Sequence, residues 1–137
     1  LKDEKGTERG YAVVYKHSLY HYALLAYMGV YPTFRGQGAA RRFLELLRER
    51  YADRQGLFLE VTDYPGSEHG RQLHDFYASL GWRDVNCDYS TGGVASALMC
   101  LPLRGPADPT PAARLILREL YAHVLPEQLI DRFSHFG

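Results

Sequence analysis

The chain has 137 residues, of which 46% are apolar, and this suits one globular domain with a closed hydrophobic core. Lysine and arginine together number 16, as do aspartate and glutamate, so the formal net charge is zero. A neutral chain has no general electrostatic attraction for nucleic acid or for an anionic membrane, so any anion site must be local.

The two cysteines, Cys87 and Cys100, could form one disulfide, but two reduced thiols in a cytoplasmic protein are the simpler interpretation. Neither cysteine has a second Cys or His at ligand spacing, so no metal site is predicted. No segment has the roughly 20 consecutive apolar residues that a membrane-spanning helix needs. No charged-then-apolar leader precedes the domain, so Leu1 is interpreted as a processing product, a fragment end or a cloning boundary.

The first part of the chain predicts a polar turn followed by two strands. Residues 1–10 are polar with two glycines, which is typical of a turn or a hairpin tip. Segments 11–18 and 20–31 are rich in β-branched and aromatic residues and predict strands joined by a tight connection. The second strand is almost continuously apolar, so we expect it at the centre of a sheet, covered on both faces.

Two amphipathic helices and three further strands are predicted next. Residues 38–51 place apolar side chains at helical spacing on one face and charged ones on the other. A second apolar helix face runs from Leu73 to Leu80, and Gly81 stands where a left-handed helix stop is expected. The predicted strands lie in residues 57–63, 82–93 (ending in a turn) and 94–103.

The composition changes near residue 105, where three prolines predict a linker. Thr110 suits an N-cap with Pro111 as the first helical residue, so 112–125 is predicted to be an amphipathic helix. Pro126 is expected to begin another short helix, which carries Leu129, Ile130 and Phe133. We therefore divide the chain into a domain of residues 1–104 and an extension of residues 105–137, which should pack on the domain or on a partner chain.

The turn Arg35-Gly36-Gln37-Gly38 stands between a predicted strand and a predicted helix. Glycines allow a backbone to approach a ligand closely, and a helix N-terminus offers unpaired N–H groups to an anion. The arginine adds donors suited to phosphate oxygens. The residues alone leave two interpretations open, a phosphate or pyrophosphate cradle and a plain strand-to-helix connection. The GxxxxGK[ST] motif is absent, and GxGxxG fails for want of a third glycine.

Residues 35–40, Arg-Gly-Gln-Gly-Ala-Ala, match the R/Q-x-x-G-x-G/A signature of the GNAT superfamily of acyl-CoA-dependent N-acetyltransferases. The preceding "YMGVYP" resembles the central strand of that family, and "LHDFYASLGW" resembles its "lYeklGF" segment. The likeness extends over roughly residues 10–103 in the family's order. It implies an α/β (α+β) fold with a mixed, mostly antiparallel central sheet flanked by helices, here followed by a C-terminal helical extension.

The resemblance implies an N-acetyltransferase that moves an acetyl group from acetyl-CoA to a primary amine of a small molecule or protein. The amine would attack the thioester directly in a ternary complex, with acetyl-CoA as the acyl-donor cosubstrate and no metal. The main chain of the turn would hold the pyrophosphate, and the main chain at the end of the central strand would lie along the pantetheine arm. The implied cofactor-binding residues are Met28, Gly29, Val30, Arg35, Gly36, Gln37, Gly38, Ala39 and Ala40.

Tyr77 matches the family position of the acid that protonates the leaving thiolate, and a phenol of pKa near 10 is a reasonable donor. Its alternative role is structural, as part of the apolar face of its helix. Glu60 is the first candidate for the base and Asp63 the second. Water could also relay the proton, and three histidines could accept it, although each is more commonly structural or exposed: His21, His69 and His74.

Two departures from the family affect these expectations. Gly70 stands where many members have an asparagine that contacts the cofactor. The segment before Arg35 is also shorter than the strand and helices that usually help to form the acceptor site, so these are missing, shortened or supplied by another chain. The alternative function is a non-catalytic acyl-CoA-binding, regulatory or oligomerisation module. We expect a cytoplasmic homodimer, formed through the C-terminal helices, without nucleic-acid or membrane partners.

Overall fold

The computed structural model describes residues 1–16, 21–85, 89–91, 93–104, 113, 117–119 and 134–136. In chain order the elements are β1 (Gly10–Lys16), β2 (Tyr22–Val30), the 3-10 helix η1 (Pro32–Phe34), α1 (Ala39–Arg50), β3 (Gly56–Thr62), α2 (Glu68–Ser79), β4 (Arg83–Asp84), β5 (Tyr89–Thr91), β6 (Val94–Pro102) and β7 (Ser134–Phe136).

The strands in the described ranges form one seven-stranded sheet with the order β1-β2-β3-β6-β5-β7, and β4 pairs with β6 beside this path. The pair β2–β3 is parallel and every other described pair is antiparallel. The parallel pair is possible because α1 lies in the connection between its strands and carries the chain back across the sheet. The mixed, mostly antiparallel α/β sheet expected from the sequence is confirmed.

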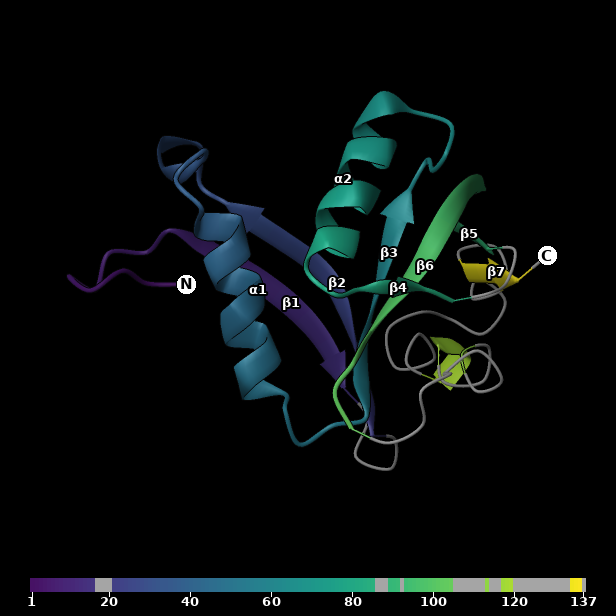
Figure 1. Cartoon of the computed structure of the whole chain (residues 1–137), viewed down its shortest axis with the longest axis horizontal. Coiled ribbons are helices and arrows are strands. Elements are labelled where there is room, and N and C mark those ends of the chain that lie inside the picture. The colour runs from purple at the N-terminus through teal and green to yellow at the C-terminus, as the bar shows by residue number, and fades with distance from the viewer. Residues whose placement is uncertain are drawn as a thin grey trace.

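Both long helices cover the same face of the sheet (Figure 1), with α1 over β1 and β2 and α2 beside β3. Their apolar stripes are the ones that the sequence predicts, since Phe43, Leu44 and Leu47 of α1 are buried against the sheet. The sheet residues of this helix-side cluster include Ala23, Leu25, Leu57, Leu59, Val61, Ala97, Met99 and Leu101.

The opposite face of the sheet has its own core, which we call the tail-side cluster because the C-terminal extension contributes to it. Ala113 is 1% exposed and Leu117 is 0% exposed, and both pack with sheet residues. The other members are Tyr22, Leu24, Phe58, Val85, Tyr89, Leu98 and Cys100. Of the two placements expected for the extension, the described part of its first helix therefore packs on its own domain.

The prediction that the second strand is covered on both faces is right for its first half and wrong for its second. Residues 22–25 of β2 are buried, whereas Ala26 and Tyr27 are exposed and Met28 to Val30 are half-buried. The reason is that only the first half has a strand on each side. β7 is a further difference, since no strand was expected at residues 134–136.

Some expectations lie outside the described residues: the connection at 17–20, the linker at 105–112, the helix after Pro126 and the thiol of Cys87. Cys100 is a buried free thiol on β6, and burial raises its pKa to about 12. No helix in the described part of the chain is long and apolar enough to cross a membrane.

Candidate functional site

The two parallel strands of the sheet separate to form a fork. β2 and β3 pair from Tyr22 with Gly56 to Leu25 with Leu59, and their register ends there. Among the described strands, β2 continues beyond this point only beside β1 and β3 only beside β6. Figure 1 shows the two strands diverging toward their C-terminal ends. Ligands of open α/β sheets bind outside the carboxyl ends of strands where neighbouring strands part, so the fork is a place for a ligand.

The three predicted pantetheine contacts lie on the free half of β2. Gly29 pairs with Tyr11 of β1. Two residues further along, Tyr31 donates its N–H to the carbonyl of Arg9 at 2.8 Å, so the backbone groups of these odd-numbered residues point toward β1. Backbone groups alternate in direction along an antiparallel pair, so those of Met28 and Val30 point away from β1 and into the fork. The main chain of Met28 and the N–H of Val30 therefore face a molecule seated between the strands, while the Val30 carbonyl accepts from Arg35.

Gly29 itself has a different local role. A Cβ atom on Gly29 would lie 3.3 Å from Cε1 of Tyr11 and 3.4 Å from Cε1 of Tyr27. These two rings stack with centroids 5.6 Å apart, on the face of the sheet opposite α1. The glycine thus gives the rings room to lie on the strand. Interaction with Tyr27, chiefly a side-chain hydrogen bond, raises the pKa of the Tyr11 phenol.

The predicted cradle is an exposed turn between η1 and α1. Gly36 has φ +76° and Gly38 has φ +75°, a backbone region that residues other than glycine rarely adopt. A Cβ atom at either glycine would meet nothing within 4 Å, so the backbone angle, and not crowding, requires glycine here. Gly38 is the N-cap of α1, with its carbonyl accepting from the N–H of Arg42 at 3.1 Å.

The N-terminus of α1 has no internal anion. Gly38 provides no side-chain cap, and the first turn of the helix contains no acidic residue. The first N–H groups of a helix have no partner within it and carry a partial positive charge. The turn therefore presents main-chain donors to the solvent, and Ala39, just inside the helix, is buried beneath them.

Arg35 is anchored at the tip of β2. Its Nε donates to the carbonyl of Val30 at 3.0 Å, so the guanidinium is held where the fork and the glycine turn meet. Gln37 stabilises the turn from the other side, since its Nε2 donates to the carbonyl of Thr33 at 3.4 Å.

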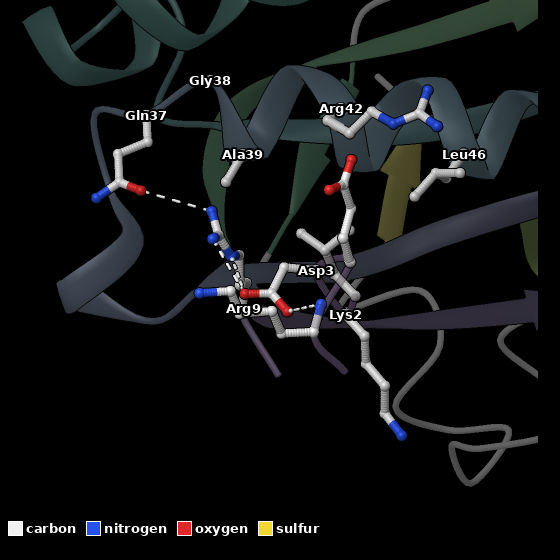
Figure 2. A pocket seen from close by; sticks show the side chains of 11 residues that line it. Lys2, Asp3, Arg9, Gln37, Gly38, Ala39, Arg42 and Leu46 are labelled. Carbon is white, nitrogen blue, oxygen red and sulfur yellow. Dashed lines mark hydrogen bonds and ion pairs between the residues drawn. The ribbon is translucent and has the colours of Figure 1, made fainter. Parts of the chain in front are cut away.

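A cavity of about 680 Å³ adjoins the turn (Figure 2). Gln37, Gly38 and Ala39 form one wall, and the N-terminal segment, including Lys2 and Arg9, forms the other. The remaining lining residues are Leu1, Asp3, Glu4, Lys5, Arg42 and Leu46. Four of the lining side chains are cations and two, Asp3 and Glu4, are carboxylates, so the lining has an excess of positive charge in a chain of zero net charge.

Arg9 connects this wall to the turn, and no pattern in the sequence marked it as a site residue. Its guanidinium lies 3.1 Å from Oδ2 of Asp3, 3.5 Å from Oε1 of Gln37 and 4.8 Å from the ring centroid of Phe34. Hydrogen bonds from the Thr7 N–H and from Arg9 lower the pKa of Asp3 against the opposing effect of desolvation.

Tyr77 lies on the sheet-facing side of α2. Its ring packs edge-on against Trp82 at 6.0 Å between centroids and beside Phe76 at 5.6 Å. Burial raises the pKa of the phenol above its ordinary value of 10.0, so the hydroxyl keeps its proton at neutral pH. Within the described ranges that hydroxyl forms no hydrogen bond.

Glu60 is the first residue of β3 beyond the last pairing with β2, so it stands at the vertex of the fork. Side chains alternate along a strand, which places Glu60 on the same face as Phe58, within reach of the tail-side cluster. Tyr89 donates its hydroxyl to Oε2 of Glu60 at 2.8 Å. Tyr77 and Glu60 therefore approach the fork from opposite faces of the sheet.

The other candidate bases are placed less favourably. Asp63 is exposed in the loop after β3, at φ +56°, and His69 is exposed on α2. His21 is exposed before β2. His74 is engaged by its neighbours, because its Nε2 lies 2.8 Å from Oδ1 of Asp84 and its ring stacks on Tyr64 at 4.2 Å.

Gly70, where the family often has asparagine, is buried beneath the loop that precedes α2. A Cβ atom there would lie 2.5 Å from the carbonyl oxygen of Asp63 and 3.0 Å from Oγ of Ser67. The loop of this chain thus excludes any side chain at this position, which accounts for the departure. Among the described residues no group of His, Cys, Asp and Glu could hold a metal ion.

Comparison with known proteins identifies the family of the chain. The sequence model of the family "Acetyltransferase (GNAT) domain" matches residues 1–84. No curated protein sequence matches the chain at a significant level.

Three solved structures illustrate the likeness in fold. The putative GNAT-family acetyltransferase from Bacteroides thetaiotaomicron has a TM-score of 0.70 at 21% identity, over 89% of this chain and 69% of that one. The ribosomal-protein-S18-alanine N-acetyltransferase from Escherichia coli has a TM-score of 0.60 at 21% identity, over 77% of this chain and 68% of that one. A chimera of the spermidine N-acetyltransferase from Vibrio cholerae and hSSAT has a TM-score of 0.62 at 12% identity, over 74% and 64%.

At these identities the structures show a shared fold, and they are longer than the part that aligns. The family match extends over more than half of the chain and includes β1, β2, the glycine turn, α1, β3 and α2. The chain therefore belongs to the GNAT acetyltransferase family, whose fold supports acyl transfer.

Proposed function

We propose that the protein transfers an acetyl group from acetyl-CoA to a primary amine of a small molecule or protein, by direct attack in a ternary complex. The observation that carries the proposal is the uncapped N-terminus of α1, preceded by two left-handed glycines and placed at the tip of a strand fork. Together these features offer main-chain donors for a pyrophosphate beside a slot for an extended chain.

In this proposal the main-chain N–H groups of Gly36 through Ala40 bind the pyrophosphate. The N–H of Arg35 donates to the carbonyl of Pro32 at 3.3 Å, so Arg35 contributes through its guanidinium. The pantetheine arm then extends along Met28, Gly29 and Val30 in the fork. The cavity beside the turn would receive the phosphorylated ribose end of the cofactor. The lining supports this assignment, because its four cations outnumber the carboxylates of Asp3 and Glu4 in a chain that is neutral as a whole.

The thioester would lie at the vertex of the fork, between the two faces of the sheet. Glu60 would accept a proton from the attacking amine on the tail side. Tyr77 would donate a proton to the leaving thiolate on the helix side, and its raised pKa supports that role because an acid must hold its proton until the thiolate departs. The amine nitrogen thus forms the new bond to the carbonyl carbon while the carbon–sulfur bond breaks.

Calorimetry with acetyl-CoA and release of coenzyme A with a panel of primary amines test the proposal together. Saturable binding that Gly38→Glu weakens, with amine-dependent thiol release, is the expected result. Binding of acetyl-CoA without release of coenzyme A on any amine would favour the second candidate, a non-catalytic acyl-CoA-binding module. Gly70 supports this second candidate, because it lacks the side chain that makes one expected cofactor contact. Folded protein that binds no acetyl-CoA would exclude both.

The assembly expected from the sequence stays a prediction, as do the domain boundary at residue 104 and the cytoplasmic location. Ala113 and Leu117 pack inside the chain, so their side chains are not available to a homodimer interface through the C-terminal helices.

A further inference from the structure

A tyrosine from the outer part of the sheet reaches the vertex of the fork. Tyr89 belongs to β5, two strands away from β3 in the sheet order, with β6 between them. Its hydroxyl nevertheless donates to Oε2 of Glu60 at 2.8 Å. The sequence gives no sign of this contact, because the two residues are far apart in the chain and share no motif.

The ring of Tyr89 is firmly held. The side chain is 5% exposed and packs in the tail-side cluster, whose members include Leu98 and Leu117. Its strand is paired on both sides, with Tyr89 opposite Ser96 of β6 and opposite Phe136 of β7. A short strand with a single neighbouring strand would hold the Tyr89 ring only weakly. The pairing with β7 gives β5 a second neighbouring strand.

We propose that Tyr89 is a positioning residue that fixes the Glu60 carboxylate at the fork vertex, on a support that the C-terminal segment completes. This inference rests on the proposed function, since it assigns Glu60 the role of proton acceptor. A catalytic carboxylate must be held in one geometry, and a buried phenol with few rotatable bonds does this at small entropic cost. A carboxylate accepts at two oxygens, so a hydrogen bond at Oε2 is compatible with proton uptake.

The position of Tyr89 means that the C-terminal extension also supports the geometry at Glu60, in addition to covering the sheet. β7 pairs with β5, and Leu117 packs in the cluster that holds the Tyr89 ring. The geometry at Glu60 thus depends on residues that follow the family match, which ends at residue 84.

Steady-state kinetics of Tyr89→Phe test the inference. The variant keeps the ring and removes only the hydroxyl, so kcat should fall about tenfold, as for a lost hydrogen bond to a charged group. KM for acetyl-CoA should stay within about twofold, because the cofactor cradle lies elsewhere. Tyr22→Phe is the matched control, since it removes a hydroxyl from the same cluster, and its kcat should remain close to that of the wild type.

The double variant Glu60→Gln/Tyr89→Phe separates positioning from a general loss of packing. If Tyr89 acts through Glu60, the roughly tenfold effect of Tyr89→Phe disappears once Glu60→Gln is already present, whereas a packing defect would multiply with it. Full multiplication, or a Tyr89→Phe variant with wild-type kcat, would overturn the inference. Wild-type turnover by Glu60→Gln would overturn it too while leaving acetyl transfer intact. Wild-type protein without amine acetylation would instead overturn the proposed function and this inference with it.

Discussion

The two long helices lie on the same face of the sheet, but their N-termini are built in opposite ways. α2 begins with Ser67, whose Oγ accepts from the N–H of Gly70 at 2.9 Å, and Glu68 follows in the first turn. α1 begins with Gly38, without a side-chain cap and without an acidic residue in its first turn. In α2 the cap accepts from a terminal N–H group and the acidic residue complements the positive end of the helix dipole. In α1 the terminal N–H groups and the positive end of the dipole have no such partner within the helix.

This difference separates two contributions to the candidate site. α1 offers main-chain donors at its end, and α2 offers a side chain, Tyr77, from its buried face. A helix that has a structural task is capped internally, as α2 is. An uncapped helix end with left-handed glycines and a positively charged cavity beside it is typical of anion binding.

The largest effect is expected from the side chain that α2 contributes. Tyr77→Phe should lower kcat about 100-fold, because a positioned acid typically accelerates proton transfer by at least that factor. Affinity for acetyl-CoA, measured by calorimetry, should change by less than about threefold. A variant that lost cofactor affinity and kept kcat would place Tyr77 in the binding machinery instead.

The next effect concerns the end of α1. Gly38→Glu should weaken acetyl-CoA binding about 30-fold, equivalent to about 2 kcal/mol, because it puts a negative charge at the positive end of the helix. Gly38→Ala is the matched control, since it shares the backbone strain at φ +75° without the charge. Equal losses of affinity in the two variants would show that the distorted turn, and not the charge, is responsible.

Arg35→Ala should weaken acetyl-CoA binding about tenfold, as expected for one charge-assisted contact. The loss should shrink as salt concentration rises, because exposed charges are screened. Arg48→Ala, at the exposed C-terminal end of α1, is the control and should leave affinity unchanged. A salt-independent loss would contradict the electrostatic role.

A change at the N-terminus of α2 should lower the stability of the fold and leave cofactor affinity unchanged, unlike a change at the N-terminus of α1. Ser67→Ala should lower the free energy of unfolding by about 1 kcal/mol, the usual cost of a lost N-cap. Urea denaturation measures this change, and acetyl-CoA affinity of the folded variant should be that of the wild type. A loss of affinity without a loss of stability would mean that α2 also binds the cofactor through its N-terminus.

The smallest effect is a dependence of stability on alkaline pH. The pKa of Tyr77 in the folded protein is raised above its unfolded value of 10.0. The contribution of the protonated phenol to the free energy of unfolding is therefore fully present below about pH 10, and it is lost as pH rises through the folded pKa. Unfolding free energy should therefore fall more steeply above about pH 10 in the wild type than in Tyr77→Phe. Cys100, with a pKa raised to about 12, adds the same slope to both proteins and cancels in the comparison. Identical slopes would mean that the phenol is not desolvated.

Local patterns predicted the elements well, because helices and strands are encoded by side-chain period and by glycine. The stripe at Phe43, Leu44 and Leu47 and the stop at Gly81, with φ +95°, both lie where the sequence places them. The exposed second half of β2 was missed, since an apolar run does not reveal how far its neighbouring strand extends. β7 was missed because its partner, β5, lies far away in the chain.

The sequence by itself determined that a glycine turn opens an amphipathic helix after a strand, and the family to which that order belongs. These features are local, and their physics operates over a few consecutive residues. Only the tertiary structure decided that β2 and β3 part after Leu25 and Leu59, that Glu60 stands at the vertex, and that Tyr89 reaches it. Such relations depend on strand register and on packing across the sheet, which bring together residues that no spacing along the chain connects.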